Sequence, residues 1–387
     1  MSAADSKPPA PEPEKASRTG KHPKYSVSTM FFHEYTLEDI LRSALSAGCD
    51  SVEFWLETPV FWVNEMPKDY MSNPDTAADR YLKELFGRFP QLSPITVHTP
   101  VLDLNPCSVN PDIARVSALW ARRALITAHN LGAEVLTLHP GRRTAKRQPG
   151  VYDYLKLCRF LDSIDAARKE LKAKAKTSPE QSAGADAGAC AYDGAGAGVM
   201  VAIENMQPAV NALLTDPEQM KYFLDGGVCG YYNNYECEEK PDDIAFRYLK
   251  MNDMLPVKGG NGNGNNGNSD SDSRGCENEP LCFTFDISHA LAGAGEKTTE
   301  DAIRYIDMYF DKIVNVHAGG TQSNRVHLPV SQSPAAQEVL KYLADCGYRR
   351  HITLEIDDLN LGKTLTLKEK KEFIAGEIGL LKAIFEG

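Results

Sequence analysis

The stretch EVLTLH, residues 134–139, is a short apolar run that ends on a histidine and follows an amphipathic segment at 112–131. A helical segment followed by a buried strand is the repeating unit of a parallel β/α fold. Seven further runs of this kind occur along the chain, at 25–31 (YSVSTMF), 51–54 (SVEF), 95–98 (ITVH), 199–204 (VMVAIE), 281–286 (LCFTFD), 313–317 (IVNVH) and 351–355 (HITLE). The other helical candidates are 36–47, 151–172, 216–224, 298–310, 335–344 and 368–385. Eight such repeats without a glycine-rich dinucleotide fingerprint predict a single (β/α)8 TIM barrel of the α/β class, with no nucleotide cofactor.

Three stretches fall outside this pattern. Residues 1–24 hold five prolines and almost no apolar side chain, so we expect a disordered tail before a barrel that spans 25–387. Residues 177–198 and 257–276 have low complexity and are interpreted as flexible insertions. Each lies between a helical segment and the next strand, which places it on the bottom face of a barrel, away from the carboxyl ends of the strands.

The composition limits the classes of function. The 42 basic and 53 acidic side chains give a formal charge of −11, which argues against a protein that coats nucleic acid through bulk charge but leaves a local basic patch open. The chain has no run of eighteen apolar residues and no apolar signal-peptide core, so we expect a cytoplasmic protein with no membrane partner. The nine cysteines are scattered without a Cys-x-x-Cys pair, which indicates neither a disulfide framework nor a thiolate zinc site.

Six of the eight predicted strands end on a residue type that binds metals. These residues are His98, His139, Glu204, Asp286, His317 and Glu355. In a barrel all these ends meet at one face, where the active sites of this architecture lie. Each residue alone is explained as well by a polar group at the surface, but the six together indicate a metal centre. Mixed imidazole and carboxylate ligands suit Zn²⁺, Mn²⁺ or Fe²⁺ better than Ca²⁺ or Mg²⁺, and we expect Zn²⁺ or Mn²⁺.

Seven segments carry a resemblance to a known superfamily. They are VHTPVLDLNPCS (97–108), LGAEVLTLHPG (131–141), VAIEN (201–205), FDISHA (285–290), NVHAGG (315–320), RVHLP (325–329) and TLEID (353–357). They resemble the xylose isomerase-like TIM barrel superfamily, which includes sugar (phosphate) isomerases and epimerases and the endonuclease IV-like enzymes of AP endonuclease family 2. The resemblance covers residues from about 25 to 385 and is specific for the superfamily rather than for one branch.

This resemblance implies roles for the strand-end residues. The four-ligand cage shared by the epimerases and the nuclease corresponds to Glu204, Asp286, His317 and Glu355. In the epimerases the two glutamates of this cage also act as the acid and base that move a proton. His98 and His139 would join Glu204 around a second metal, as in the nuclease.

A third metal site of the nuclease is matched only in part. His289 and His327 correspond to two of its ligands, but Arg325 stands where the nuclease has an aspartate. A guanidinium does not coordinate a cation, so this departure speaks against a third metal and against three-metal phosphodiester chemistry. The two histidines are therefore candidates either for a third metal or for contact with substrate.

Other polar residues near the strand ends are candidates for binding substrate or phosphate. They are Arg142 and Arg143 in a loop with four bases at 142–147, together with Arg325, Asn205 and His33. A solvated charged loop explains the basic residues equally well, and a structural histidine explains His33 equally well. Asn205 either orients Glu204 or binds a hydroxyl group, and Glu53 either contacts substrate or forms an ion pair within the barrel rim.

The sequence leaves three classes of function open. The first is a metal-dependent isomerase or epimerase of a sugar or sugar phosphate, favoured by the complete cage, the acidic charge and the arginine at 325; its partner would be a small carbohydrate. The alternative is an endonuclease IV-type phosphodiesterase acting on abasic DNA, favoured by the additional histidines and the basic loop. A barrel that binds metal or sugar without turnover is the third class, because a fold does not by itself establish catalysis.

Overall fold

The computed structural model describes residues 22–58, 76–177, 198–224, 280–292, 298–322 and 325–387, and the statements below concern only these residues. Eight parallel strands close into a barrel in the order β1, β10, β7, β6, β5, β4, β3, β2. The strands are β1 Lys24–Ser28, β2 Ser51–Trp55, β3 Thr96–His98, β4 Val135–Leu138, β5 Met200–Glu204, β6 Cys282–Asp286, β7 Ile313–Ala318 and β10 His351–Leu354. Each of the eight predicted runs supplies one strand, which confirms the predicted (β/α)8 TIM barrel.

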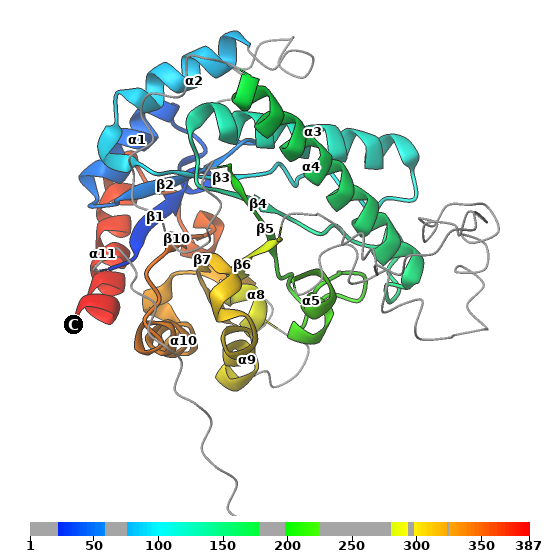
Figure 1. Ribbon diagram of the computed structural model, residues 1–387. Coiled ribbons are helices and arrows are strands. Elements are labelled where there is room, and N and C mark those ends of the chain that lie inside the picture. Colours follow the sequence, from blue (N-terminus) through cyan, green and yellow to red (C-terminus); the bar gives the residue numbers. More distant parts are fainter. Residues whose placement is uncertain (1–21, 59–75, 178–197, 225–279, 293–297, 323–324) are drawn as a thin grey trace, which may run out of the picture.

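Helices surround the barrel (Figure 1). The α-helices are α1 Leu37–Ser46, α2 Ala77–Gly87, α3 Pro111–Leu131, α4 Val151–Thr177, α5 Pro217–Leu224, α8 Ile287–Leu291, α9 Thr299–Tyr309, α10 Pro334–Asp345 and α11 Leu367–Glu386. The 3-10 helices are η1 Thr29–Phe32, η3 Pro90–Leu92, η5 Phe310–Lys312, η6 Val330–Gln332 and η7 Asp358–Leu361. Side-chain caps fix several starts: the Thr36 hydroxyl accepts from the Asp39 backbone N–H, and Thr76 and Thr366 each form a capping box.

Several elements differ from the sequence expectation. The run at 25–31 forms a strand only as far as Ser28, because the Ser28 hydroxyl accepts a hydrogen bond from the Met30 N–H and starts η1 there. Helix α2 was not predicted. A two-stranded antiparallel sheet of β8 (Gly320–Gln322) and β9 (Arg325–Leu328) follows β7 and was also not predicted, since its strands are too short to show a period.

Some sequence expectations lie outside the described residues. Of the expected tail, residues 1–21 are not described, and β1 begins at Lys24, one residue earlier than expected. Almost the whole of the expected insertion at 177–198, and all of the one at 257–276, lie in the stretches 178–197 and 225–279 that are not described. Their place relative to the barrel faces therefore stays a prediction.

Polar side chains cross the interior of the barrel. The hydroxyls of Thr137 on β4 and Thr284 on β6 are 2.9 Å apart, and the Asn315 amide on β7 donates to Glu53 on β2 at 2.6 Å. Neither pair of strands is adjacent in the barrel, so these contacts span its interior. Alternate residues of a strand point to the same side, so the residue two positions after each of these inward groups also faces the interior, at the carboxyl end of its strand. This layer of polar groups therefore lies beneath the predicted metal ligands.

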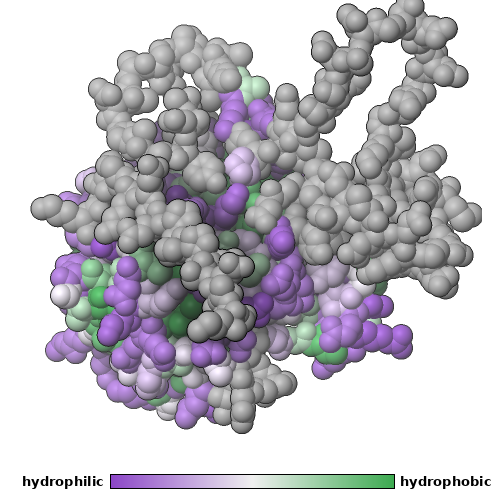
Figure 2. Space-filling view, turned by 60° about the horizontal axis from the view of Figure 1, so that its bottom comes forward, coloured by the Kyte–Doolittle hydropathy of each residue, from purple (hydrophilic) through white to green (hydrophobic). Residues whose placement is uncertain are grey.

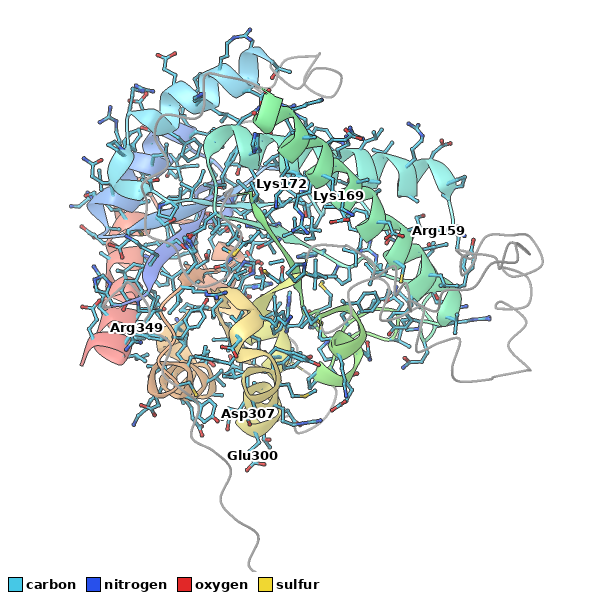
Figure 3. The ribbon with its side chains drawn as sticks, in the orientation of Figure 1. Arg159, Lys169, Lys172, Glu300, Asp307 and Arg349 are labelled. Carbon is cyan, nitrogen blue, oxygen red and sulfur yellow. The ribbon has the colours of Figure 1, made fainter. Side chains whose placement is uncertain are left out.

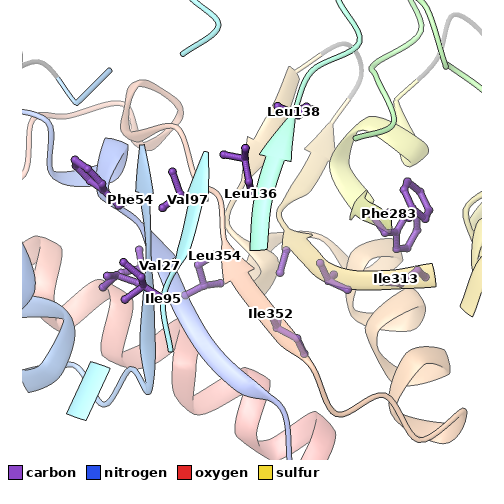
Figure 4. Close-up of a cluster of buried hydrophobic side chains, with 14 of the residues drawn as sticks. Val27, Phe54, Ile95, Val97, Leu136, Leu138, Phe283, Ile313, Ile352 and Leu354 are labelled. Atoms are coloured by element: carbon purple, nitrogen blue, oxygen red, sulfur yellow. The ribbon is translucent and has the colours of Figure 1, made fainter. Parts of the chain in front are cut away.

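Apolar residues on the outer side of the strands pack against the helices (Figure 4). They alternate with the inward polar residues, so Val97, Leu136 and Leu354 face outward beside inward Thr96, Thr137 and Thr353. The main hydrophobic core is therefore the shell between the strands and the helices. The barrel interior holds the polar and charged groups toward the carboxyl ends of the strands, together with a small separate apolar cluster of Val135, Ala202, Cys282 and Val314.

Charged side chains cover the outer helices. Figure 3 places Arg159 and Lys169 on α4 and Glu300 on α9, and all three are exposed. The described part of the face shown in Figure 2 is largely hydrophilic, with small apolar areas between the charged groups. Within the described ranges, none of the helices combines the length and the apolar character that crossing a membrane requires.

A substitution at Phe283 tests the outer core. This fully buried ring of β6 packs against Phe285, Tyr305 and Tyr309. We expect Phe283→Ala to lower the free energy of unfolding by about 3–5 kcal/mol, because truncation leaves a cavity that its neighbours fill only in part. Urea unfolding measures the change. The control Met308→Ala, at a residue 39% exposed, should change the value by less than about 0.5 kcal/mol, and equal effects would contradict the assigned core.

Candidate metal centre

The six predicted strand-end residues meet at the carboxyl end of the barrel. His98, Glu204 and Asp286 are the last residues of β3, β5 and β6, while His139 and Glu355 directly follow β4 and β10. With His317 of β7 and two further histidines they form three groups whose ligand atoms lie within 4.8 Å of one another. We call them the His98 group (His98, His139, Glu204), the central group (Glu204, Asp286, His317, Glu355) and the His327 group (Asp286, His289, His327). Glu204 and Asp286 each belong to two groups.

The His98 group converges on one oxygen of Glu204. His98 Nε2 lies 3.3 Å and His139 Nε2 lies 3.0 Å from Glu204 Oε2. The His98 Nδ1–H donates to the Thr99 carbonyl at 2.7 Å, which leaves Nε2 free to act as a ligand. The indole of Trp55 stacks on the His98 ring at 3.8 Å with an angle of 8° between the planes. His98 is therefore fixed by contacts on its edge and on its face.

The central group surrounds one nitrogen of His317. His317 Nδ1 lies 2.6 Å from Glu355 Oε2, 3.4 Å from Glu204 Oε1 and 3.9 Å from Asp286 Oδ2. The other ring nitrogen, Nε2, lies 3.0 Å from Glu53 Oε1. One edge of this ring thus meets the three carboxylates of the cage, and the other meets a fourth carboxylate deeper in the barrel.

The His327 group obtains its carboxylate from β6. His289 Nδ1 lies 3.4 Å and His327 Nδ1 lies 3.9 Å from Asp286 Oδ2, and the two rings are 5.0 Å apart. Arg325, which occupies the position where the resemblance implies an aspartate, is exposed on β9. The arginine therefore does not remove the third group, because Asp286 is close enough to serve it as well as the central group.

The backbone around His327 is unusual. His327 has a φ of +57°, a left-handed conformation that non-glycine residues seldom adopt and that is concentrated at functional sites. Gly319 permits the approach of this segment: a Cβ at 319 would lie 2.8 Å from the Glu355 carbonyl oxygen and 3.3 Å from His327 Cα. The Asp357 N–H donates to the His327 carbonyl at 2.9 Å and ties β9 to the loop after β10.

Several ligand atoms of these groups have no hydrogen bond of acceptable geometry within the described part of the chain, although they are buried. They are His139 Nε2, Glu204 Oε1, Asp286 Oδ2, His317 Nδ1 and Glu355 Oε2. Buried polar atoms normally have a partner, and an unsatisfied one costs about 1–3 kcal/mol. Divalent cations fit these atoms in donor type, number and position, because each group consists of imidazole nitrogens and carboxylate oxygens that lie close together.

The charges in the centre shift several pKa values. Burial raises the pKa of Asp286. Burial alone would lower the pKa of His289, but Asp286 and Glu204 raise it to about 9. Burial opposes ionisation of Glu355 as well, yet His317 and His327 bring the pKa of this carboxyl down to about 2. In the absence of a cation, imidazolium and carboxylate groups therefore neutralise one another.

The candidates for substrate contact have different surroundings. The side chain of Asn205 donates to the Asp286 carbonyl at 2.9 Å and accepts from the Asp286 N–H at 2.8 Å, so it holds Asp286 and is fully buried. Arg143 donates to the Gln148 carbonyl at 2.6 Å in its own loop and lies 3.7 Å from Asp153 in the first turn of α4. Arg142 is exposed, and its backbone N–H and carbonyl both bond to the Asn105 side chain.

His33 forms a separate group with Glu34 and Asp358. The ammonium of the fully buried Lys370 lies 2.7 Å from Glu34 and 2.8 Å from Asp358, so a cation already neutralises these carboxylates. His33 itself bonds to the Met30 carbonyl and is half-buried. This arrangement is a structural link between the loops after β1 and β10.

A cavity of about 230 Å³ adjoins the centre. His139 and His289 line it, together with the polar residues Arg142, Gln207 and Asn211. Much of the remaining lining is apolar, with contributions from Leu104, Phe160 and Met206. The cavity therefore borders both the His98 group and the His327 group.

Two residues that shape the centre were not identified from the sequence: Trp55, which stacks on His98, and Gly319, which allows the approach of β9. Glu53 was expected either to contact substrate or to form an ion pair, and its Oε1 lies 3.0 Å from His317 Nε2, in agreement with the ion pair. One sequence signal points to Glu53 and Trp55: they stand two residues apart in β2, so both side chains face the same side of the strand, toward the barrel interior. The roles of all three depend on contacts between strands that are distant in the chain.

Comparisons with known proteins agree with this fold. Residues 41–226 match the family model described as a xylose isomerase-like TIM barrel. An uncharacterized protein of Methanocaldococcus jannaschii is 23% identical over 367 residues, covering 93% of this chain and 99% of the relative. The structure of D-psicose 3-epimerase from Clostridium cellulolyticum is similar with a TM-score of 0.55 at 11% identity, covering 94% of this chain and 99% of that one. Endonuclease IV from Thermus thermophilus is similar with a TM-score of 0.50 at 13% identity, covering 94% and 99%. The fold is thus common to an epimerase and a nuclease.

The raised pKa of His289 predicts a pH dependence of metal binding. Only the neutral imidazole ligates a metal, so the affinity of the apoprotein for Zn²⁺ should rise from neutral pH up to about 9, with release of protons. Competition with a chromogenic chelator measures the affinity, and a weakly buffered titration counts the protons. His289→Ala should remove about one proton from the number released at neutral pH. An unchanged proton count in this variant would contradict the assignment.

A methyl group at position 319 tests the approach of β9. We expect Gly319→Ala to displace the His327 segment, because the added Cβ meets backbone atoms that cannot rotate away. Metal bound by the His327 group should be lost first, and elemental analysis of the dialysed protein measures the stoichiometry. Gly376→Ala, which adds a Cβ with nothing within 4 Å, is the matched control. The same metal content in both variants would show that the approach does not matter.

Proposed function

Because this chain is a xylose isomerase-like TIM barrel, we propose that it is a metal-dependent phosphoester hydrolase whose centre holds more than one divalent cation, Zn²⁺ or Mn²⁺. The single observation that carries the proposal is the sharing of Glu204 and Asp286 among three ligand groups. A carboxylate that faces two neighbouring ligand groups would suit a centre that holds more than one cation.

The two oxygens of Glu204 face different groups. Oε2 lies close to His98 and His139, whereas Oε1 lies 3.4 Å from His317 and 3.3 Å from His289. A carboxylate that removes a proton from a sugar needs one oxygen directed at the substrate. Both oxygens of Glu204 are directed at imidazoles instead, which supports a ligand role for this residue over proton transfer.

Bound cations supply Lewis acidity to a phosphoryl oxygen and lower the pKa of water. The chain itself orients the groups around them: Asn205 holds the backbone of Asp286, and the Thr99 carbonyl fixes the ring of His98. The cavity beside His139 and His289 receives the organic part of the substrate. Arg142 is exposed and lines the cavity, and its positive charge suits an anionic oxygen of a phosphate.

A second candidate is the isomerisation or epimerisation of a sugar or sugar phosphate. The complete central group favours it, since Glu204, Asp286, His317 and Glu355 correspond to the single-metal cage that the resemblance implies for epimerases. The formal charge of −11 and the compact cavity also favour a small carbohydrate over duplex DNA. In this case Glu204 and Glu355 would exchange a proton with the substrate carbon.

Metal counting together with two assays distinguishes the candidates. The hydrolase requires two or three equivalents of Zn²⁺ or Mn²⁺ per chain and cleavage of bis(p-nitrophenyl) phosphate or of a duplex with an abasic site. Glu204→Gln should lower the rate by at least about 10²-fold, because the amide replaces one of the two carboxylate oxygens with an NH2 group and removes the negative charge that would hold the cations. Glu134→Gln, at the opposite end of the barrel, should keep the activity. One equivalent of metal, with solvent deuterium exchange into a ketose and no phosphoester cleavage, would establish the second candidate instead.

A further inference from the structure

Glu53 is a carboxylate buried in the barrel beneath the metal ligands. It is 0% exposed, and its side chain meets groups from three strands. Oε1 accepts from Trp55 Nε1 at 3.1 Å and lies 3.0 Å from His317 Nε2. Oε2 accepts from the Thr96 hydroxyl at 2.9 Å and from the Asn315 amide at 2.6 Å. An isolated buried carboxylate is strongly unfavourable, so these four contacts are what make its position tenable.

The neighbours of Glu53 require a side chain that accepts hydrogen bonds through both of its terminal atoms. The Trp55 indole and the Asn315 amide can only donate through the atoms that face Glu53, and the Thr96 hydroxyl donates to Oε2. A carboxylate has acceptor positions on both oxygens, whereas the isosteric amide of glutamine has one acceptor and one donor end. The site is therefore specific for a carboxylate rather than merely for a polar side chain of this size.

Two of the contacts lead to different metal groups. The His317 ring presents Nε2 to Glu53, at ion-pair distance but without hydrogen-bond geometry, and Nδ1 to the three carboxylates of the central group; with the proton on Nε2, Nδ1 is left as the ligand atom. The Trp55 indole, anchored on the same Oε1, stacks on the ring of His98. A carboxylate on the far nitrogen of a ligand histidine fixes the orientation and tautomer of the ring and raises its basicity.

We propose that Glu53 is a positioning residue that fixes His317 directly and His98 through Trp55, so that one buried carboxylate aligns the central group and the His98 group together. The inference rests on the proposed metal centre and applies to hydrolase and isomerase alike. A carboxylate that only fills the barrel interior would stabilise the fold without changing how metal is bound.

The test compares metal binding by the wild-type protein and Glu53→Gln. Cobalt(II) is the probe, because its visible absorption bands report the geometry of the ligands, and competition with a chelator gives its affinity. We expect Glu53→Gln to bind Co²⁺ about 10–100-fold more weakly and with altered bands, as loss of such a partner commonly does. Thermal unfolding of the metal-free proteins separates this effect from a change in stability.

Two further variants complete the comparison. Trp55→Phe keeps an aromatic ring on His98 but removes the N–H that bonds to Glu53; it should weaken binding of the cation at the His98 group while the central group keeps its affinity. It also carries the test if Glu53→Gln does not fold. Glu134→Gln is the control, because Glu134 pairs with His351 Nε2 at 2.7 Å, away from the ligand groups, and should leave the cobalt bands unchanged.

The outcomes separate the two levels of the proposal. Wild-type affinity and bands in both Glu53→Gln and Trp55→Phe would overturn the positioning role and leave the metal centre intact. A wild-type protein that binds no Co²⁺, Zn²⁺ or Mn²⁺ would overturn the metal centre and this inference with it. Weaker binding in Glu53→Gln with unchanged binding in Glu134→Gln supports the positioning role.

Discussion

The burial of four carboxylates beside imidazole rings is the constraint on which the centre of this barrel depends. Glu53, Glu204 and Asp286 are fully buried and Glu355 lies beside them. Carboxylates of like charge repel when they are removed from water, and only cations or hydrogen-bond donors offset that cost. Without a metal, the charged histidines balance part of this charge, yet several oxygens keep no hydrogen bond among the described residues. This excess of buried negative charge would be unfavourable in a hydrophobic core, and it makes the site favourable for divalent cations.

The β-strand period carries this constraint through the barrel. Inward residues stand two positions apart, so Thr96, Thr137 and Thr353 form a polar layer directly below His98, His139 and Glu355. Outward residues of the same strands build the hydrophobic shell under the helices. The outward residues therefore stabilise the fold, while the inward residues make up the centre. A substitution on one side of a strand need not disturb the other side. Glu53 is the exception, since it belongs to the polar layer and contacts a ligand above it.

The sequence predicted the barrel and the meeting of six metal-binding residue types at its strand ends, because both are encoded locally. A run such as VMVAIE shows its strand character and its terminal Glu204 within six residues, and the closure of the barrel then brings the ends together. Arg325 shows where reasoning from single positions fails. Because an arginine stands where the resemblance implies an aspartate, the sequence argued against a third group of metal-binding residues. In the structure, Asp286 of another strand lies near His289 and His327 and completes that group. Which carboxylate serves which histidine is a matter of distance between strands.

The sequence by itself determined the order of the eight barrel strands and of most helices, the inward and outward faces of the strands, and the residue types at their carboxyl ends, because these follow from a period of two and from local capping. Only the tertiary structure decided that Glu204 and Asp286 are shared between groups, that Glu53 lies against His317, and that His327 adopts a left-handed backbone beside Gly319. Those features arise where β2, β5, β6, β7 and β9 meet. Their positions depend on the closure of the barrel, in which residues far apart in the chain come within a few ångströms of each other.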